Sequence, residues 1–382
     1  MNIRNEALNH LEQFAENNLG LYGVERNFDY GPANRNNTSN LSKYISHRVI
    51  NECEVIQSAY RKFSFKKIEK FIQEVLWRTY WKGWLEMRPQ VWQDYTQDLS
   101  ELTAETKKLN YQNAINSKTS ISCFNDWAIE LKKHGYLHNH TRMWFASIWI
   151  FTLNLPWQLG ADFFLKHLLD GDPASNTLSW RWVAGLHTKG KHYLATEWNI
   201  NKFSSKKYNN LHLNEKANTK IENTNYTIKE IEYDDISPKK SLFLFHNLDS
   251  SLLNEASIKK NCIYGLIDFN LILKNHNYSN QVLEFKKKIN YDLRKEIKNK
   301  LNSEIYVQTK EDIQKLISEK NIEQIIFPYI TIGYEHDYIN KLKENFSIKY
   351  EVRDYDKFCW QFSTKGYFAF KEQIPKILAK FL

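Results

Sequence analysis

The sequence predicts at least two domains, an all-helical domain followed by a small parallel α/β domain. Its 382 residues are enough for two or three domains. Eleven of the twelve tryptophans lie before residue 200, where apolar residues recur at helical spacing. After residue 240, short apolar runs alternate with amphipathic segments, as in a parallel sheet with crossover helices. We expect the helical domain over residues 1–206, a polar linker over 207–240 and the α/β domain over 241–382.

The composition favours a polyanionic partner. The net charge is +9 and the isoelectric point is near 9.0, a balance typical of nucleic-acid binding, although richness in Lys and Asn also arises from biased base composition. The four cysteines are scattered and form no CxxC pair, which argues against a zinc site and a disulfide framework. No run reaches ~18 apolar residues, and the first helix carries acids, unlike a signal peptide. We therefore expect a soluble, cytoplasmic protein without a membrane segment.

The first part of the chain combines a helix with a long loop. Residues 4–19 carry an apolar stripe at helical spacing, and a stretch rich in Gly, Pro and Asn follows. The loop ends at residues 38–42, with the sequence TSNLS. Hydroxyls and free backbone amides at the start of a helix suit a phosphate group. Taken alone, this motif favours an ordinary Ser or Thr N-cap.

A strong helix is predicted over residues 64–87. One face is apolar, whereas another carries Glu74, Trp77, Arg78 and Trp81 at positions i, i+3, i+4 and i+7. Two indoles beside a carboxylate and a guanidinium are unusual on a polar face. Such a face can stack on a nucleobase next to a phosphate backbone. The alternative is a face that packs against another domain.

The segment 138–182 places charges inside an aromatic and apolar region. Arg142, Asp170 and Asp172 must each be paired or bind a ligand, because lone buried charges are very costly. Asp172 precedes Pro173, a combination of N-cap and first helical residue that begins a helix.

The preceding helix has a face formed by Asn139, Arg142 and Met143, which share one side at helical spacing. His138 and His140 flank this face, and without a third ligand nearby we expect them to make polar contacts rather than to bind a metal. The sequence contains no metal-ligand cluster and no Ser/His/Asp arrangement. A cofactor would therefore have to supply the reactive group.

The rest of the chain differs in composition and in its pattern of apolar residues. After the polar linker, amphipathic helices are predicted over 285–301 and 310–321 between five short apolar runs. The runs lie at 241–245, 262–267, 304–308, 324–330 and 347–352. This alternation predicts a small Rossmann-like parallel sheet with right-handed crossovers. It carries neither a GxGxxG nor a Walker motif, so no nucleotide site is predicted there.

Several motifs of the first half occur in an order that is specific although each is weak alone. They are Tyr22…Arg26, Thr38-Ser39…Leu41-Ser42, Glu74-x-x-Trp77-Arg78, His138-Asn139…Arg142-Met143, Asp170-Gly171-Asp172, Asn176 and Trp180-x-Trp182. Over about half of the chain, this set resembles the flavin-binding catalytic domain of the DNA photolyase and cryptochrome family. The resemblance implies an all-helical domain that binds a U-shaped FAD.

The resemblance also implies which residues bind the cofactor. They are Tyr22, Thr38, Ser39, Leu41, Ser42, Arg142, Asp170, Asp172 and Asn176. The hydroxyl-rich residues would hold the diphosphate and ribityl part. Arg142 and Asp170 would pair beside the isoalloxazine, Asp172 would contact its edge, and Asn176 would face flavin N5.

Further residues carry implied roles in electron transfer. Trp180 and Trp157 match the first two members of the chain that photoreduces flavin. No tryptophan occupies the position of the third member, for which Trp92, Trp127 and Tyr111 are the candidates.

The implied substrate pocket receives damaged bases of UV-irradiated DNA. Its residues are Glu74, Trp77, Arg78, Asn139, Met143 and Trp182. Family members that repair (6-4) photoproducts have His where this chain has Asn139 and Met143, so the pocket resembles the cyclobutane pyrimidine dimer type. The implied reaction is light-driven electron donation from reduced FAD to a dimer flipped out of the helix, with Glu74 hydrogen-bonding the dimer radical anion.

The chain departs from the family pattern at several positions. Asn40 replaces a basic residue of the phosphate motif, so Arg35 or Lys43 would have to meet the diphosphate charge. His140 stands where a backbone-binding Arg is common. The α/β segment follows the flavin domain instead of preceding it, and we expect it to be the family's antenna domain in swapped order, with an antenna chromophore of undetermined type.

Two functions remain open from the sequence. The first is a photolyase, which both stacking tryptophans of the pocket favour. The second is a cryptochrome-like blue-light photoreceptor that signals through a partner. We expect a monomer that binds UV-damaged DNA.

Overall fold

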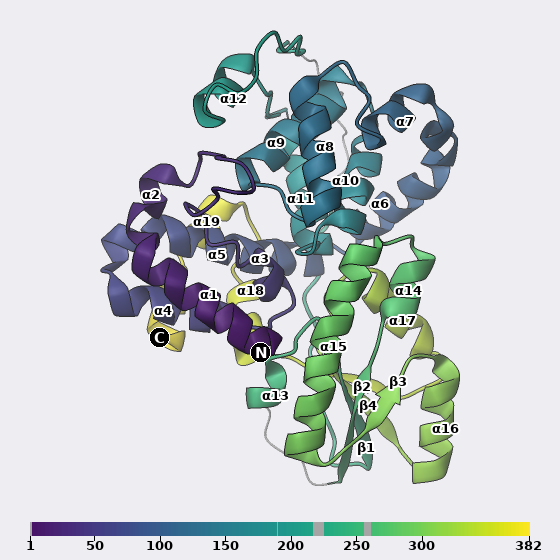
Figure 1. The fold of residues 1–382 in the computed structure, drawn as a ribbon. Coiled ribbons are helices and arrows are strands. Elements are labelled where there is room, and N and C mark those ends of the chain that lie inside the picture. Colours follow the sequence, from purple (N-terminus) through teal and green to yellow (C-terminus); the bar gives the residue numbers. More distant parts are fainter. Residues whose placement is uncertain (1, 189, 217–224, 256–260) are drawn as a thin grey trace.

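The structure is a computed structural model that describes residues 2–188, 190–216, 225–255 and 261–382. It combines a helical region with a parallel sheet flanked by helices, and the two lie end to end in Figure 1. This combination confirms the coarse fold class predicted from the sequence. Within the described ranges, no helix is long and apolar enough to span a membrane.

The helical region is built from short and medium helices around one long helix, α5. Local caps fix several ends: Asn51 and Glu54 form a capping box at α4, and Gly135 ends α8 with φ of 62°. The elements are α1 (Ile3–Asn17), α2 (Tyr22–Glu25), α3 (Ser42–Ser46), α4 (Glu52–Lys62), α5 (Phe65–Glu86), α6 (Gln90–Glu101), α7 (Leu109–Ile115), α8 (Ser122–His134), α9 (Asn139–Ser147), α10 (Trp157–His167), α11 (Pro173–Val183) and α12 (Glu197–Phe203), with 3₁₀ turns at Leu19–Leu21 and Leu102–Lys107 and a π turn at Ile148–Thr152.

The sheet has five parallel strands in the order β3-β2-β1-β4-β5. Leu242 of the central strand pairs with Ile263 on one side and with Ile325 on the other. All residues of β1 and β4 are buried, because helices cover both faces of the sheet. The strands are β1 (Ser241–Phe245), β2 (Cys262–Ile267), β3 (Ile305–Val307), β4 (Gln324–Pro328) and β5 (Ile348–Glu351); the helices between them are α13 (Leu252–Glu255), α14 (Asn270–Asn275), α15 (Asn280–Leu301), α16 (Lys310–Lys320) and α17 (Tyr334–Leu342).

The chain returns to the helical region after the sheet. Its last helices, α18 (Asp354–Trp360), α19 (Tyr367–Lys371) and α20 (Ile374–Phe381), are yellow in Figure 1, where α18 and α19 lie beside α5. Contact with α5 is close: a Cβ on Gly83 would lie 2.9 Å from Cα of Trp360. The tail after β5 is thus packed on the helix that carries the Glu74-x-x-Trp77-Arg78 motif.

A buried ion-pair network joins the sheet to the helical region. The guanidinium of Arg48 contacts Asp356 at 2.6 Å and Asp249 at 3.2 Å, and Arg353 contacts Asp249 at 2.5 Å. Burial would raise the pKa of Asp249, but Arg353 and Arg48 more than offset this and hold the pKa well below its usual range. Removing one member would leave a buried charge unpaired, so this network couples the two regions.

The polar segment between the two regions forms no helix or strand where it is described, within 207–216 and 225–240. It is nevertheless attached to both regions: the Tyr226 hydroxyl donates to Asp94 at 2.8 Å, and Lys349 donates to Asp234 at 3.1 Å. The expected domain boundaries remain a prediction.

Candidate functional site

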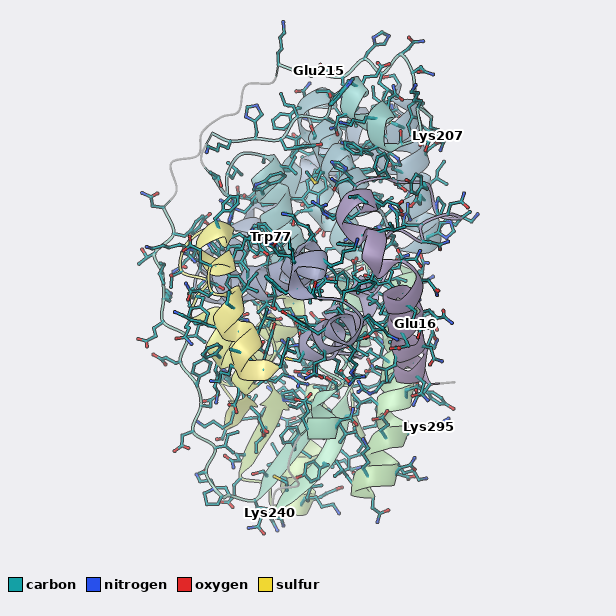
Figure 2. The ribbon with its side chains drawn as sticks, turned by 90° about the vertical axis from the view of Figure 1, so that its left-hand side faces the viewer. Glu16, Trp77, Lys207, Glu215, Lys240 and Lys295 are labelled. Atoms are coloured by element: carbon teal, nitrogen blue, oxygen red, sulfur yellow. The ribbon has the colours of Figure 1, made fainter. Side chains whose placement is uncertain are left out.

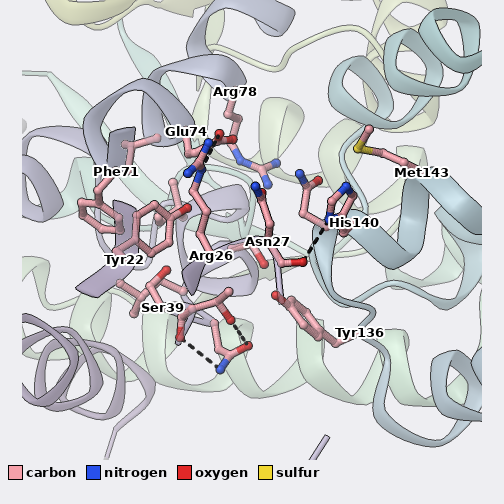
Figure 3. A pocket seen from close by; sticks show the side chains of 17 residues that line it. Tyr22, Arg26, Asn27, Ser39, Phe71, Glu74, Arg78, Tyr136, His140 and Met143 are labelled. Carbon is pink, nitrogen blue, oxygen red and sulfur yellow. Dashed lines mark hydrogen bonds and ion pairs between the residues drawn. The ribbon is translucent and has the colours of Figure 1, made fainter. Parts of the chain in front are cut away.

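A cavity of about 350 Å³ opens between α2, the segment 38–42, α5 and α9, a size within the ~300–1,000 Å³ typical of small-molecule sites. Figure 3 shows its lining side chains converging from these elements. Nine of the lining residues were predicted from the sequence: Tyr22, Thr38, Ser39, Leu41 and Ser42 for the cofactor, and Glu74, Arg78, Asn139 and Met143 for the substrate. The fold therefore brings parts of both predicted sets to one cavity.

The segment 38–42 takes its shape from Asn40. This residue has φ of 50°, in the left-handed region that Asn tolerates better than most residues. Its side-chain amide donates to the carbonyl of Arg35 at 2.9 Å. Asn40 thus fixes the loop that presents Thr38 and Ser39 to the cavity.

The two basic residues expected to replace a cation at position 40 lie outside the cavity lining. Arg35 is buried and pairs with Asp29 at 2.8 Å and with Glu130 at 2.7 Å. Lys43 lies over the ring of Tyr44, 4.8 Å from its centroid. The guanidinium groups that line the cavity belong instead to Arg26 and Arg78.

Two histidines join α9 to the loop after α2. The ring of His138 hydrogen-bonds to the carbonyl of Arg26, and that of His140 to the carbonyl of Asn27, each at 2.9 Å. Burial lowers the pKa of His138 to about 4, so the ring is neutral at pH 7. These contacts position Asn139, the first residue of α9, at the cavity wall.

Glu74 lies inside the cavity next to Arg26, with 3.9 Å between carboxylate and guanidinium (Figure 3). Its side chain keeps 39% of its surface accessible through the open cavity. Burial among the cavity walls raises the pKa of Glu74, and Arg26 offsets this only in part. The group therefore holds its proton to a higher pH than a free carboxyl and can donate a hydrogen bond in that form.

The buried charges of segment 138–182 are paired within the protein. Both carboxylate oxygens of Asp170 accept from Arg142, at 3.1 and 2.9 Å. Asp172 caps α11 through Ser175 and accepts from Arg78 at 3.2 Å. Burial would raise the pKa of Asp170, but Arg142 and Arg78 outweigh it, so its pKa lies below the usual value. The pairing satisfies the condition that the sequence imposed on these charges.

Tyr136 is a cavity residue that sequence reasoning missed. Two guanidinium groups lie over its ring, that of Arg142 at 5.1 Å and that of Arg35 at 5.2 Å from the centroid. It follows the left-handed Gly135 that ends α8. A single tyrosine after a helix carries no periodic signal, so only the fold reveals it.

Part of the chain is similar to known proteins. Residues 71–222 match the family model described as the FAD binding domain of DNA photolyase. Over this region, the chain is similar to the DNA photolyase and cryptochrome family. The match confirms FAD as the cofactor.

Individual relatives are distant. The deoxyribodipyrimidine photo-lyase of Neurospora crassa is 29% identical over 190 residues, 47% of this chain and 30% of the relative, and that of Buchnera aphidicola is 30% identical over 175 residues, 44% and 36%. The matched part thus spans about a third of the length of these relatives. A crystal structure of a bacterial class III photolyase from Agrobacterium tumefaciens has 26% identity and a TM-score of 0.45, covering 53% of this chain and 42% of that one.

The residues present fit the flavin cofactor of the family. Thr38, Ser39 and Ser42 bring hydroxyls to the cavity, and Arg26 and Arg78 bring positive charge, the groups that a diphosphate needs. Four predicted cofactor residues, Arg142, Asp170, Asp172 and Asn176, are outside the lining of this cavity. The amide of Asn176 donates to the carbonyl of Ala161 at 2.8 Å. The individual roles of these residues remain predictions.

The two tryptophans assigned to the photolyase-type substrate pocket are also outside the cavity lining. The Trp77 ring stacks on Tyr367 of α19, with 3.4 Å between centroids and 11° between planes. The Trp182 ring stacks on Tyr193 at 5.9 Å. Tyr367 was missed because nothing in the tail sequence indicates which helix it contacts.

The predicted electron-transfer tryptophans lie in two aromatic clusters. Trp180 contacts Trp149 at 6.2 Å, and Trp149 contacts Tyr111 at 5.9 Å. A Cβ on Gly160 would lie 2.3 Å from the Trp180 ring, so only glycine admits that ring against α10.

The second cluster contains Trp157, which stacks on Tyr95 at 5.7 Å, while Tyr95 contacts Trp92 at 5.3 Å. Of the candidates for a third donor, Tyr111 lies in the first cluster and Trp92 in the second. The third candidate, Trp127, stacks on Trp144 at 5.7 Å.

Proposed function

We propose that this protein is a light-dependent DNA-repair flavoprotein that splits cyclobutane pyrimidine dimers. The observation that carries the proposal is the convergence of Glu74, Arg78, Asn139 and Met143 with the hydroxyl-bearing segment 38–42 on one cavity. The substrate residues and the cofactor residues share walls there, as an electron transfer between cofactor and lesion requires. The curated relatives named deoxyribodipyrimidine photo-lyase support the same conclusion.

In this proposal FAD, when bound, supplies the electron that light excites. Thr38, Ser39 and Ser42 hold its diphosphate, and Arg26 balances the negative charge. The ion pair of Arg142 with Asp170 and the hydrogen bond of Asn176 to Ala161 fix the groups assigned to the isoalloxazine side. Their pre-arranged charges need no reorganisation during the reaction.

The substrate side of the proposal assigns three contacts. Glu74, whose pKa burial raises, hydrogen-bonds a carbonyl oxygen of the dimer when it carries its proton. Asn139 offers an amide to the base edges, and Met143 offers an adaptable apolar contact. A dimer is already poorly stacked, so extruding it into the cavity costs less than extruding an undamaged base.

Binding to the DNA backbone would rest on the positive charge of the protein. With a net charge of +9, phosphate contacts by Lys and Arg supply affinity that does not depend on sequence and weakens with salt. We further propose that the α/β region is the antenna module of the family placed after the flavin domain, in a monomeric, cytoplasmic protein.

A repair assay tests the proposal directly. The protein is loaded with FAD, reduced, mixed with a thymine-dimer oligonucleotide and kept in blue light or in the dark. We expect dimer loss only in the light. A flavin-loaded protein that leaves the dimer intact under light would overturn the proposal.

The alternative is a cryptochrome-like photoreceptor. The stacking of Tyr367 on Trp77 favours it, because this contact covers a ring assigned to the lesion. A receptor would photoreduce its flavin and change the exposure of the tail without removing dimers, so the same assay separates the two functions.

A further inference from the structure

The tail helix α19 places an aromatic ring on Trp77. Figure 2 shows Trp77 next to the yellow C-terminal helices. The Tyr367 and Trp77 rings are 3.4 Å apart at their centroids and nearly parallel, at 11°. The same spacing separates stacked bases along a DNA strand, ~3.4 Å. Tyr367 therefore occupies the position that a base stacked on Trp77 would take.

Tyr367 is held there by contacts of the tail with α5. Its hydroxyl donates to the carbonyl of Gln73 at 2.7 Å. Phe370, on the same short helix, is fully buried and lies 5.6 Å from the ring of Tyr80. The Tyr80 hydroxyl in turn donates to the carbonyl of Lys365 at 3.1 Å. These contacts define one position for the Tyr367 ring, from which a competing base would have to displace it.

Little of the Trp77 ring remains for another partner. Trp81 lies one turn further along α5, with 5.1 Å between centroids and a tilt of 34°, and Tyr80 approaches edge-on at 5.6 Å. A base that stacks on the face covered by Tyr367 must displace that side chain.

We propose that Tyr367 occupies the stacking position of a nucleobase on Trp77, so that the tail and damaged DNA compete for the same ring. The inference rests on the proposed function, since it takes the competitor to be a base of dimer-containing DNA. Stacking of a base on an aromatic side chain and stacking of two aromatic side chains are of similar strength. The apparent Kd for DNA rises by the inverse of the fraction of molecules in which Trp77 is free. Tyr367 thereby tunes affinity for lesions without touching the cavity.

The test compares Tyr367→Ala with wild type by fluorescence anisotropy on a thymine-dimer oligonucleotide, in the dark and at one fixed salt concentration. We expect Tyr367→Ala to lower the Kd about threefold to tenfold. Phe368→Ala is the matched control, because Phe368 sits on the same helix with 83% of its surface exposed, and it should leave the Kd unchanged. An equal or higher Kd for Tyr367→Ala would overturn the inference.

A double-mutant cycle with Trp77→Ala shows whether the effect of Tyr367→Ala on the Kd depends on the Trp77 ring. Without Trp77, the Tyr367→Ala change should no longer tighten binding. A gain of the same size in both backgrounds would contradict competition for Trp77.

Hydrogen exchange on the wild-type chain gives a readout that needs no variant. Adding the dimer oligonucleotide should speed amide exchange in residues 366–373, because the tail leaves α5 when a base takes its place. Slower exchange there would mean that the tail stays and DNA covers it, which overturns the inference even if Tyr367→Ala fails to fold.

The outcomes also separate this inference from the proposed function. Wild-type protein that repairs the dimer while Tyr367→Ala binds no tighter would overturn only the role of Tyr367. If neither wild type nor any variant binds or repairs the dimer, the proposed function fails and this inference fails with it.

Discussion

The two sides of α5 differ in what faces them. Glu74 and Arg78 face an open cavity, whereas Trp77 is covered by Tyr367 and Trp81 lies against His187 at 4.7 Å. The sequence placed all four residues on one face. Because a helix turns about 100° per residue, neighbours such as Trp77 and Arg78 point in clearly different directions. One helix thus serves a ligand site on one side and an intramolecular contact on the other.

The difference shows that the cavity side is organised by charge and the covered side by aromatic packing. On the cavity side, Arg78 and Arg142 are held by Asp172 and Asp170. On the covered side, stacking between rings fixes the tail. Substitutions on the first side should therefore alter stability through unpaired charge, and those on the second should alter affinity.

The largest effect is expected from breaking a charge pair on the cavity side. Arg142→Ala leaves the carboxylate of Asp170, which is 4% exposed, without its partner. We expect a loss of about 3–5 kcal/mol in the free energy of unfolding, because a buried charge without a partner is strongly destabilising. Urea unfolding of the flavin-free protein measures this loss.

An exposed pair provides the control. Lys108→Ala breaks a pair with Glu105 in which the lysine side chain is 63% exposed, and it should cost less than about 0.5 kcal/mol. Similar losses for the two variants would show that the Arg142 pair is no more important than a surface pair.

The next effect concerns the loop that forms one cavity wall. Asn40→Ala should cost about 2 kcal/mol, because alanine is strained at a φ of 50° and the hydrogen bond to Arg35 is lost. Asn40→Gly loses only the hydrogen bond and should cost about half as much. Unfolding midpoints of both variants test this, and a glycine variant weaker than the alanine variant would contradict the role of the backbone conformation.

A smaller effect is expected on repair. Glu74→Ala should lower the yield of dimer splitting about tenfold while leaving FAD bound, because the hydrogen bond to the dimer is lost. Trp77→Ala should lower the yield too, with FAD retained. Repair per absorbed photon and the flavin absorbance measure the two properties.

The matched control is Glu319→Ala. Glu319 is an exposed carboxylate that pairs with Lys315 on α16, away from the cavity lining and from the tail helices. It should repair like wild type. Release of flavin by Glu74→Ala or Trp77→Ala would show that the substrate pocket is assigned to the wrong residues.

The sequence predicted the architecture better than the contacts. Helical periodicity and alternating apolar runs located α5 and the five strands, because burial imposes those patterns locally. The motif order located Glu74, Asn139 and segment 38–42 at one cavity. It could not reveal that Tyr367 covers Trp77, because a contact across nearly three hundred residues depends on how the tail returns to α5.

The sequence likewise did not predict which charged residues pair with each other. The sequence required partners for Arg142, Asp170 and Asp172, but it did not identify Arg78 as the partner of Asp172. It also offered Arg35 as a cation for the diphosphate, although Asp29 and Glu130 already bind that guanidinium. Ion pairs between separate helices follow from packing and carry no signal of their own in the spacing of residues.

The smallest effect is expected in the pH dependence of stability, where two carboxyl groups near α5 act with opposite sign. The lowered pKa of Asp170 adds stability that is full above pH ~3.9 and is lost as the pH falls through the lowered value. The raised pKa of Glu74 adds stability that is full below pH ~4.3 and is lost as the pH rises through the raised value. Asp170→Asn should therefore flatten the acid limb of the stability curve, and Glu74→Gln should remove a decline above pH ~4.3. Urea unfolding at a series of pH values resolves the two limbs. If the loss of stability at low pH is the same in Asp170→Asn as in wild type, the pair with Arg142 does not depress the pKa of Asp170. The cavity side of α5 would then not be organised by charge pairing.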